Sequence, residues 1–102
     1  MFIVANRIPV TKNYQEMFEE RFRNRAGHIE EQAGFVSMQV LKPAKPDLPY
    51  VVYTTWEDKQ SFEQWFGSED FRIAHANPMP KEAFEGENIV EMYDIIISAE
   101  HV

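Results

Sequence analysis

His75 has the widest chemical repertoire of any side chain in this sequence, and its setting is unusual for a histidine. It follows Phe71 and Ala74 on the apolar face of a predicted short helix. In such a place an imidazole is either a half-buried core group bonded to a backbone carbonyl or a ligand for a metal. For a single histidine without further context, the core interpretation is the more common one.

Asn6 is unusual for a different reason, because asparagine is disfavoured inside the strand that residues 2–10 predict. It shares one face of that strand with Phe2 and Val4. A buried amide needs hydrogen-bond partners. Asn6 therefore either pins a neighbouring loop or donates its NH₂ group to a ligand in a pocket.

Trp65 lies between Phe62 and Phe66 at helical spacing, and an aromatic stripe of this kind is usually core. In one straight helix, Trp65 and His75 would point about 80° apart and would not share a face. Gly67 followed by Ser68 predicts a helix break and a new N-cap. A break there allows both side chains to reach one pocket.

The elements that position these residues alternate between strands and helices. Asn13 and Glu16 mark the start of an amphipathic helix, which we expect to run to about Glu31 and to stop near Gly34. The predicted elements are, in order, strand 2–10, helix 13–31, strands 35–42 and 50–57, short helices after Asp58 and Ser68, and strand 88–99. This β-α-β-β-α-β order predicts an α+β, ferredoxin-like fold, an antiparallel sheet with helices on one face.

Apolar residues on both faces of several strands predict a partner for the second face of the sheet. The runs at 2–4, 51–53 and 95–97 place apolar side chains on both sides. Two helices cover only one face of a four-stranded sheet, so the other face needs a covering surface. A second copy of the same chain supplies one through an isologous contact, and we expect a homodimer.

Composition limits the classes of function. The chain has 102 residues, expected to form a single domain over 1–102, and a formal net charge of −7. Such a surface repels phosphate backbones and anionic lipid, so we expect no nucleic-acid or membrane partner. No apolar run is long enough to span a membrane and there is no cysteine. The start of the chain lacks the features of a signal peptide, and we expect a cytoplasmic protein.

Six motifs spread almost from end to end carry a family resemblance. They are A-N-R at 5–7, E-R-F with R and G beyond it at 20–27, G-F at 34–35, W-x-x-K-Q-x-F-x-x-W at 56–65, S-x-x-F-x-x-A-H at 68–75 and Tyr93-Asp94 in the last strand. With these motifs the chain resembles the IsdG-type haem-degrading monooxygenases, a branch of the antibiotic biosynthesis monooxygenase superfamily. That family forms a dimeric α+β barrel and uses an Asn, a Trp and a His as its signature.

The resemblance implies a haem oxygenase in which haem is both cofactor and substrate. His75 would be the axial ligand of the iron, and Trp65 would press the macrocycle out of plane. Asn6 would donate a hydrogen bond on the distal side. External electrons from a reductase and dioxygen would open the ring, with release of iron and a linear tetrapyrrole.

Further residues are implied with less specificity. Phe22 and Phe71 would line the haem pocket, although Phe22 is equally typical of core. Arg21 and Arg25 are candidates for the anionic propionates, with Arg25 the better match to the family, and a solvated helix face is the competing interpretation. We interpret His28 and His101 as surface residues. For Glu91 and Asp94, in the last strand, the sequence leaves open whether they face the pocket or a dimer seam.

Three other functions stay open at this point. A cofactor-free monooxygenase acting on quinols or polyketide phenols would use the same pocket without iron. A haem carrier would use the same His75 without opening the ring. An interaction module of this fold would fill the pocket with its own aromatic side chains. The sequence does not indicate which carbon of the ring is attacked, what carbon product leaves or which reductase supplies the electrons.

Overall fold

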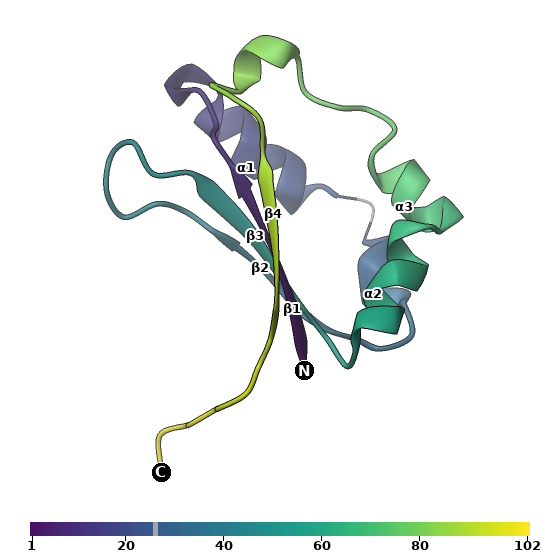
Figure 1. The fold of residues 1–102 in the computed structure, drawn as a ribbon. Helices are drawn as coiled ribbons and strands as arrows, with labels where there is room; N and C mark the ends of the chain where they lie inside the picture. Colours follow the sequence, from purple (N-terminus) through teal and green to yellow (C-terminus); the bar gives the residue numbers. More distant parts are fainter. Residues whose placement is uncertain (26) are drawn as a thin grey trace.

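The computed structural model describes residues 1–25 and 27–102 as one sheet with helices packed on it (Figure 1). The strands are β1 (Phe2–Ile8), β2 (Phe35–Leu41), β3 (Tyr50–Trp56) and β4 (Ile89–Asp94). The α-helices are α1 (Gln15–Arg23), α2 (Lys59–Phe66) and α3 (Glu69–Ala74). Short 3₁₀ turns are η1 (Lys12–Tyr14), η2 (His28–Glu31) and η3 (Lys81–Ala83). No helix in this described part of the chain is long and apolar enough to cross a membrane.

The sheet has the order β2-β3-β1-β4, and all neighbouring strands are antiparallel. β1 therefore lies in the interior of the sheet, with Asn6 opposite Val52 on one side and Val90 on the other. This arrangement confirms the predicted ferredoxin-like fold. It also places Asn6 on a strand that is paired along both edges.

Two apolar clusters join the helices to one face of the sheet, the face that carries Phe2 and Val4. The first contains Phe2, Val4, Trp56 and Trp65, and the second contains Val10, Phe18 and Tyr50. Figure 1 shows α1, α2 and α3 on the same side of the strands. The two clusters leave a space between α1 and the α2–α3 pair, above the middle of β1.

The predicted break at Gly67-Ser68 is confirmed. Asp58 caps α2 by accepting a hydrogen bond from the Ser61 N–H at 2.8 Å. Ser68 then caps α3, with its Oγ accepting from the Phe71 N–H at 3.1 Å. Each cap satisfies a helix N–H that has no partner within its own helix. The chain therefore changes direction between Trp65 and His75.

The predicted helix over 13–31 is wrong in its second half. α1 ends at Arg23, and Gly27 adopts a left-handed conformation with φ of 75° before η2 begins. The apolar stripe of α1 stops at Phe22, so nothing holds a further helical turn against the sheet. The residue between Arg25 and Gly27 lies outside the described residues.

All four strands end earlier than predicted, β1 and β4 by more than one residue. β1 ends at Ile8 rather than residue 10, because Pro9 has no N–H for the ladder. β4 ends at Asp94 rather than residue 99, because its partner β1 begins at Phe2, opposite Asp94. One further bond, from Ile95 N to Met1 O at 3.0 Å, continues the pairing. The tail then extends away from the sheet, with Ile96 88% exposed (Figure 1).

Candidate functional site

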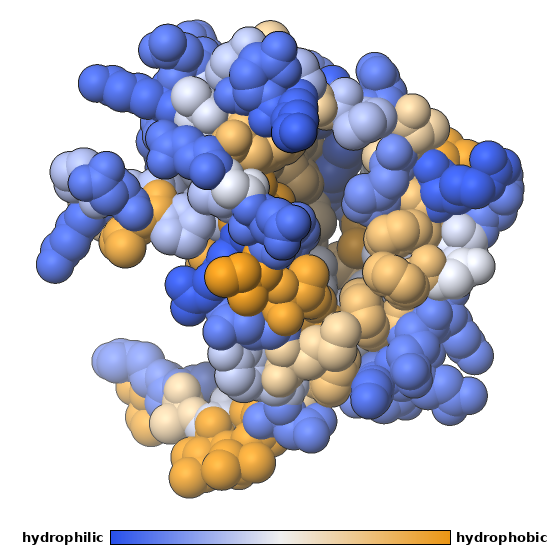
Figure 2. All heavy atoms as spheres, turned by 45° about the horizontal axis from the view of Figure 1, so that its top comes forward, coloured by the Kyte–Doolittle hydropathy of each residue, from blue (hydrophilic) through white to orange (hydrophobic). Residues whose placement is uncertain are grey.

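A cavity of about 940 Å³ fills the space between α1 and the α2–α3 pair, above the sheet. Its floor is formed by β1 and β3, one wall by α1, and the other by α3 and the segment that leads from α3 to β4. The space-filling view shows the molecule hollowed between two lobes, with apolar side chains at the margin (Figure 2). Every residue predicted for the site lines this cavity, namely Asn6, Phe22, Arg25, Trp65, Phe71 and His75.

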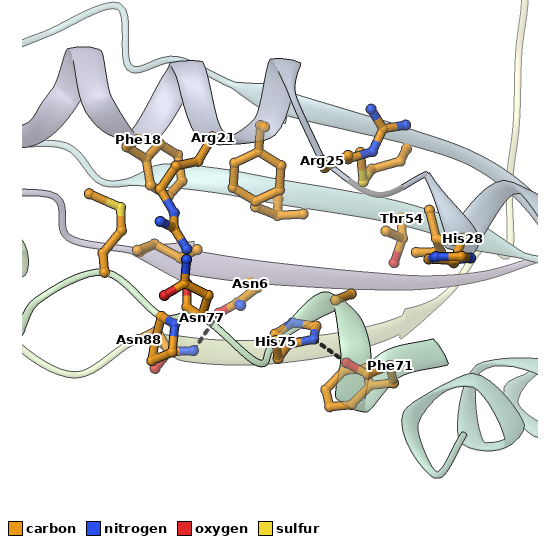
Figure 3. A pocket seen from close by; sticks show the side chains of 18 of the residues that line it. Asn6, Phe18, Arg21, Arg25, His28, Thr54, Phe71, His75, Asn77 and Asn88 are labelled. Carbon is orange, nitrogen blue, oxygen red and sulfur yellow. Dashed lines mark hydrogen bonds between the residues drawn. The ribbon is translucent and has the colours of Figure 1, made fainter. Parts of the chain in front are cut away.

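His75 is the C-cap of α3, and its ring lies against the cavity (Figure 3). Its Nδ1 lies 2.8 Å from the carbonyl oxygen of Phe71, one helical turn earlier. A carbonyl only accepts, so Nδ1 carries the proton and donates it to this bond. In the neutral ring the lone pair is then on Nε2, at the far side of the imidazole. The bond to a carbonyl and the role of a metal ligand, alternatives in the sequence, are therefore compatible.

Phe71 connects His75 to Trp65 through aromatic contacts. The imidazole stacks on the Phe71 ring with centroids 4.0 Å apart and planes 27° apart. Phe71 also meets Trp65 edge-on, with centroids 5.5 Å apart and planes at 81°. Trp65 is only 6% exposed and belongs to the core cluster with Phe2 and Val4. The core thus fixes Trp65, and Trp65 supports the wall that carries His75.

Asn6 faces Asn88 across the cavity floor (Figure 3). Nδ2 of Asn88 donates a 2.9 Å hydrogen bond to Oδ1 of Asn6. This bond occupies the acceptor of the Asn6 amide and turns its NH₂ group away from Asn88. The two possibilities given by the sequence, pinning a loop and donating to a ligand, are again compatible. The residue Asn88 was missed, since nothing local in the sequence links it to a position 82 residues away.

The cationic side chains of the cavity differ in their partners. Arg25 forms an ion pair with Glu30 of η2. Arg21 reaches from α1 across the cavity and donates to the backbone carbonyl of Asn77 (Figure 3). Both arginines are exposed, so the interpretation as a solvated face and the role in ligand binding both fit their positions.

His28, interpreted from the sequence as a surface residue, has a side chain that is 37% exposed and also lines the cavity. Gly27, with its positive φ, turns the chain so that η2 starts at His28. Nδ1 of His28 lies 3.9 Å from Oδ1 of Asp70, and Oδ2 of Asp70 accepts from Gln32 at 2.9 Å. The fold, and no sequence motif, brings this second imidazole to the same cavity.

Glu91 lies on the opposite face of the sheet and takes no part in the cavity. Its carboxylate accepts a hydrogen bond from Arg7 Nε, and hydrogen bonds from Arg7 and then Tyr93 lower the pKa of this carboxyl. The same contact with Glu91 raises the pKa of the Tyr93 hydroxyl. Asp94 is an exposed residue at the end of β4. Glu91 therefore does not face the pocket, which is one of the two positions that the sequence left open.

The donor set of the cavity limits the metal chemistry it can support. Within residues 1–25 and 27–102, no group of three or more His, Cys, Asp or Glu side chains could hold a metal ion. A single imidazole is a sufficient protein ligand only for a metal that brings its other ligands with it. The cavity walls are mainly apolar and aromatic, which suits a large flat ligand.

A family model described as antibiotic biosynthesis monooxygenase matches residues 1–77. A heme-degrading monooxygenase of Shouchella clausii is 35% identical over 97 residues, covering 93% of this chain and 90% of that protein. A staphylobilin-producing heme oxygenase of Staphylococcus haemolyticus is 38% identical over 79 residues, covering 76% and 75%.

Solved structures agree in fold over nearly the whole chain. The heme-degrader MhuD from Mycobacterium tuberculosis, with two hemes bound in its active site, superposes with a TM-score of 0.81 at 26% identity, covering 98% of this chain and all of that one. A mutant of MhuD with two manganese protoporphyrin IX molecules per active site gives a TM-score of 0.85 at 25% identity, covering 99% and 100%.

Proposed function

This chain belongs to the antibiotic biosynthesis monooxygenase family, and from that premise we propose that it is a haem-degrading monooxygenase of the IsdG type. It binds haem through His75 and uses dioxygen and external electrons to open the porphyrin and release iron. The observation that carries the proposal is the position of His75. Its Nδ1 is hydrogen-bonded to the carbonyl of Phe71 while its ring lines a cavity of about 940 Å³.

The residues of the cavity fit haem. Haem iron needs one imidazole from the protein because the macrocycle supplies the nitrogens of its plane, and one oriented imidazole is what His75 offers. The hydrogen bond from Nδ1 to the Phe71 carbonyl fixes the ring orientation and leaves the lone pair of Nε2 for the iron. When bound, haem supplies the iron that activates dioxygen and the ring that is oxidised.

The aromatic wall of the cavity would contact the bound macrocycle. Trp65 is held by the core, so its indole edge does not yield to a flat ligand pressed against it. In this proposal Trp65 would press on the bound macrocycle, and Phe71 keeps Trp65 and His75 at a fixed separation. Phe22 and the aliphatic stem of Arg25 add contacts from the opposite wall.

Asn6 supplies the polar group on the sheet side of the cavity. Because Asn88 occupies its Oδ1, the Nδ2 group is the part of the amide left for a ligand. A fixed amide donor stabilises negative charge on an oxygen that reacts nearby, and costs no reorganisation during the reaction. Asn6, Trp65 and His75 are thus the proposed catalytic residues.

The open face of the sheet supports a homodimer as the working form. It carries Ile3, Tyr53 and Tyr93, the last of them 52% exposed, on the side away from the helices. An apolar face of this kind is usually covered, and a second copy would cover it symmetrically. A sedimentation profile that stays monomeric at micromolar concentration would overturn this part of the proposal.

The remaining partners follow from the reaction. Dioxygen is the oxidant, and a reductase supplies the electrons that ring opening consumes. The lack of cysteine fits the reducing conditions of the cytoplasm, where we place the protein.

An absorbance titration of the purified protein with haem, followed by ascorbate in air, tests the proposal. We expect a saturable Soret band that bleaches with reductant while iron is released. His75→Ala should lose the ligand-dependent spectrum and most turnover, whereas His101→Ala, in the exposed tail, should behave as the unmodified chain.

Two outcomes would contradict this function. Haem that binds but survives reductant and oxygen indicates a carrier. The absence of a saturable Soret band indicates a cofactor-free monooxygenase, for which quinols would be the next substrates to test.

A further inference from the structure

We infer that Gln32 is a positioning residue for His75, because its side-chain amide ties α3, the helix capped by His75, to η2. The inference rests on the proposed function only for the task of His75, which is to hold the iron of the ligand. Neither Gln32 nor its partner Asp70 lines the cavity. Gln32 therefore acts through the helix and not through contact with the ligand.

Few contacts keep α3 in its place. The helix has six residues, and none of them is buried. Its half-buried Phe71 packs against Trp65 and Phe66 of α2, the helix that directly precedes it. Helices this short are not stable by themselves. Contacts with the rest of the fold must therefore hold α3, and with it His75, against the cavity.

A hydrogen bond between Gln32 and Asp70 is such a contact. Nε2 of Gln32 donates to Oδ2 of Asp70 at 2.9 Å. Within residues 1–25 and 27–102, this is the only side-chain hydrogen bond between α3 and another element of the fold. His28 approaches the same carboxylate, but its Nδ1 lies 3.9 Å from Oδ1, too far for a hydrogen bond. The directional contact with α3 is thus the one from Gln32.

The two neighbours of the Gln32 amide fix its orientation. Nε2 also donates to the backbone carbonyl of His28 at 3.0 Å. This carbonyl and the Asp70 carboxylate only accept, and an NH₂ group has one hydrogen for each of them. The opposite orientation would place the carbonyl oxygen of Gln32 against two acceptors. The side chain therefore has one favourable arrangement, which includes the bond to α3.

Gln32 is itself anchored to the sheet. It is the C-cap of η2, and its backbone carbonyl accepts from the Phe35 N–H at 3.2 Å, at the start of β2. Ile29 of η2 packs against the core cluster that contains Trp65. The bond to Asp70 thus joins a helix without buried residues to a segment held by the core. Its loss should allow α3 to move together with His75.

Reversal of this hydrogen bond tests the role. Gln32→Glu has nearly the same shape but places a carboxylate against Asp70, which repels it. Asp70→Asn alone keeps an acceptor for Gln32 and should change little. In the double variant, Gln32→Glu with Asp70→Asn, the new amide donates to the new carboxylate. The double variant should therefore recover most of what Gln32→Glu loses.

Two forms of the ligand separate the position of His75 from general packing. Iron protoporphyrin IX accepts an imidazole ligand, and metal-free protoporphyrin IX has the same macrocycle without a metal. Gln32→Glu should weaken binding of the iron form about tenfold, the effect of one lost hydrogen bond to a charged group, and leave the metal-free form nearly unchanged. Gln64→Glu is the matched control, since it adds the same charge at an exposed residue of α2 outside the cavity.

Hydrogen exchange of backbone amides, followed by NMR, is a readout that needs no ligand. The N–H groups of Arg72 and His75 donate to carbonyls one turn earlier, so they exchange when α3 opens. Gln32→Glu should speed their exchange about tenfold, and the double variant should slow it again. The amides of β1 should exchange as in the unmodified protein, which checks that the sheet is intact.

Three results would overturn the inference: unchanged exchange of the α3 amides in Gln32→Glu, an equal loss of affinity for the two porphyrins, or a double variant that recovers neither property. If the unmodified protein binds neither porphyrin, or both equally well, His75 does not hold an iron and the proposed function fails. The exchange of the α3 amides then still decides whether Gln32 holds the helix.

Discussion

Asn88→Asp is the substitution that most directly tests how the cavity orients the amide of Asn6, the hydrogen-bond donor proposed to face the ligand. In the structure, Nδ2 of Asn88 donates to Oδ1 of Asn6 at 2.9 Å. A carboxylate in its place only accepts, so it faces Oδ1 with repulsion and attracts the NH₂ group instead. We expect the Asn6 amide to rotate by half a turn, which presents its carbonyl oxygen to the ligand.

The substitution should affect the stability of the protein and the rate of the reaction to different extents. Asn88 is exposed, so loss of the bond should change the free energy of unfolding by only about 1 kcal/mol. At the ligand, however, a donor is replaced by an acceptor. Removal of one donor from a site that stabilises negative charge costs about a hundredfold or more in rate, and the reversal should cost at least as much. Asn88→Ala, which only releases the amide, should cost less.

The assay is single-turnover loss of the Soret band with ascorbate in air, together with the dissociation constant for haem. We expect Asn88→Asp to lower the rate of ring opening and to leave haem affinity almost unchanged, because His75 is untouched. A double mutant with Asn6→Ala separates positioning from direct action. If Asn88 acts only through Asn6, the double mutant should be no slower than Asn6→Ala alone.

Two results would refute this reasoning. The first is an Asn88→Asp variant that turns over at the rate of the unmodified protein. The second is a double mutant in which the two losses multiply, because independent losses mean that Asn88 does not work through the orientation of Asn6.

The remaining predictions concern stability and are measured by urea denaturation. Gly34→Ala should lower the free energy of unfolding by about 2 kcal/mol or more, because Gly34 has φ of 80° and a Cβ there would collide with the Ser61 side chain. Ser61→Gly in the same chain should recover part of the loss. A Gly34→Ala variant as stable as the unmodified chain would contradict the turn geometry. Tyr50→Phe should cost about 1 kcal/mol at neutral pH. Burial and then the hydrogen bond to Glu19 raise the pKa of the Tyr50 hydroxyl from its ordinary value of 10.0 to about 12. Between these two values the unfolded chain has lost the hydroxyl proton and the folded chain has kept it, so the free energy of unfolding falls as the pH rises. Tyr50→Phe should lack this dependence on pH. Ser68→Ala should cost about 1 kcal/mol through loss of the α3 cap. Ser68→Asp should cost less, because it keeps an acceptor for the Phe71 N–H and loses only the donor to the Trp65 carbonyl.

The features that the sequence predicts correctly depend on contacts between near neighbours. The break at Gly67-Ser68 could be predicted because a cap bonds to an N–H only three residues away. The same holds for the start of α2 at Asp58. Alternation within residues 2–8 likewise placed Asn6 on the face that carries Phe2 and Val4, the face on which the helices and the cavity lie.

The features that it does not predict depend on contacts across the fold. β4 was expected to be longer because the run at 95–97 is strongly apolar, yet a strand needs a partner, and β1 begins opposite Asp94. The cavity position of His28 depends on a left-handed Gly27 and on the packing of η2 against α3. The ion pair between Arg25 and Glu30 depends on that same turn. Periodicity and spacing contain none of these long-range distances.

The three proposed catalytic side chains are fixed to different degrees, and this difference matches the tasks proposed for them. Asn6 lies on an interior strand and Trp65 lies in the core, so the sheet side and the aromatic wall are rigid before any ligand enters. His75 is exposed, at the end of a six-residue helix, where one bond to Phe71 and one stacking contact fix its ring. In the proposed function, Trp65 would have to be stiffer than a flat ligand that presses on it, and its place in the core provides this stiffness. His75 would need only an imidazole held in one orientation, which the hydrogen bond to Phe71 and the stacking contact provide at the end of the helix.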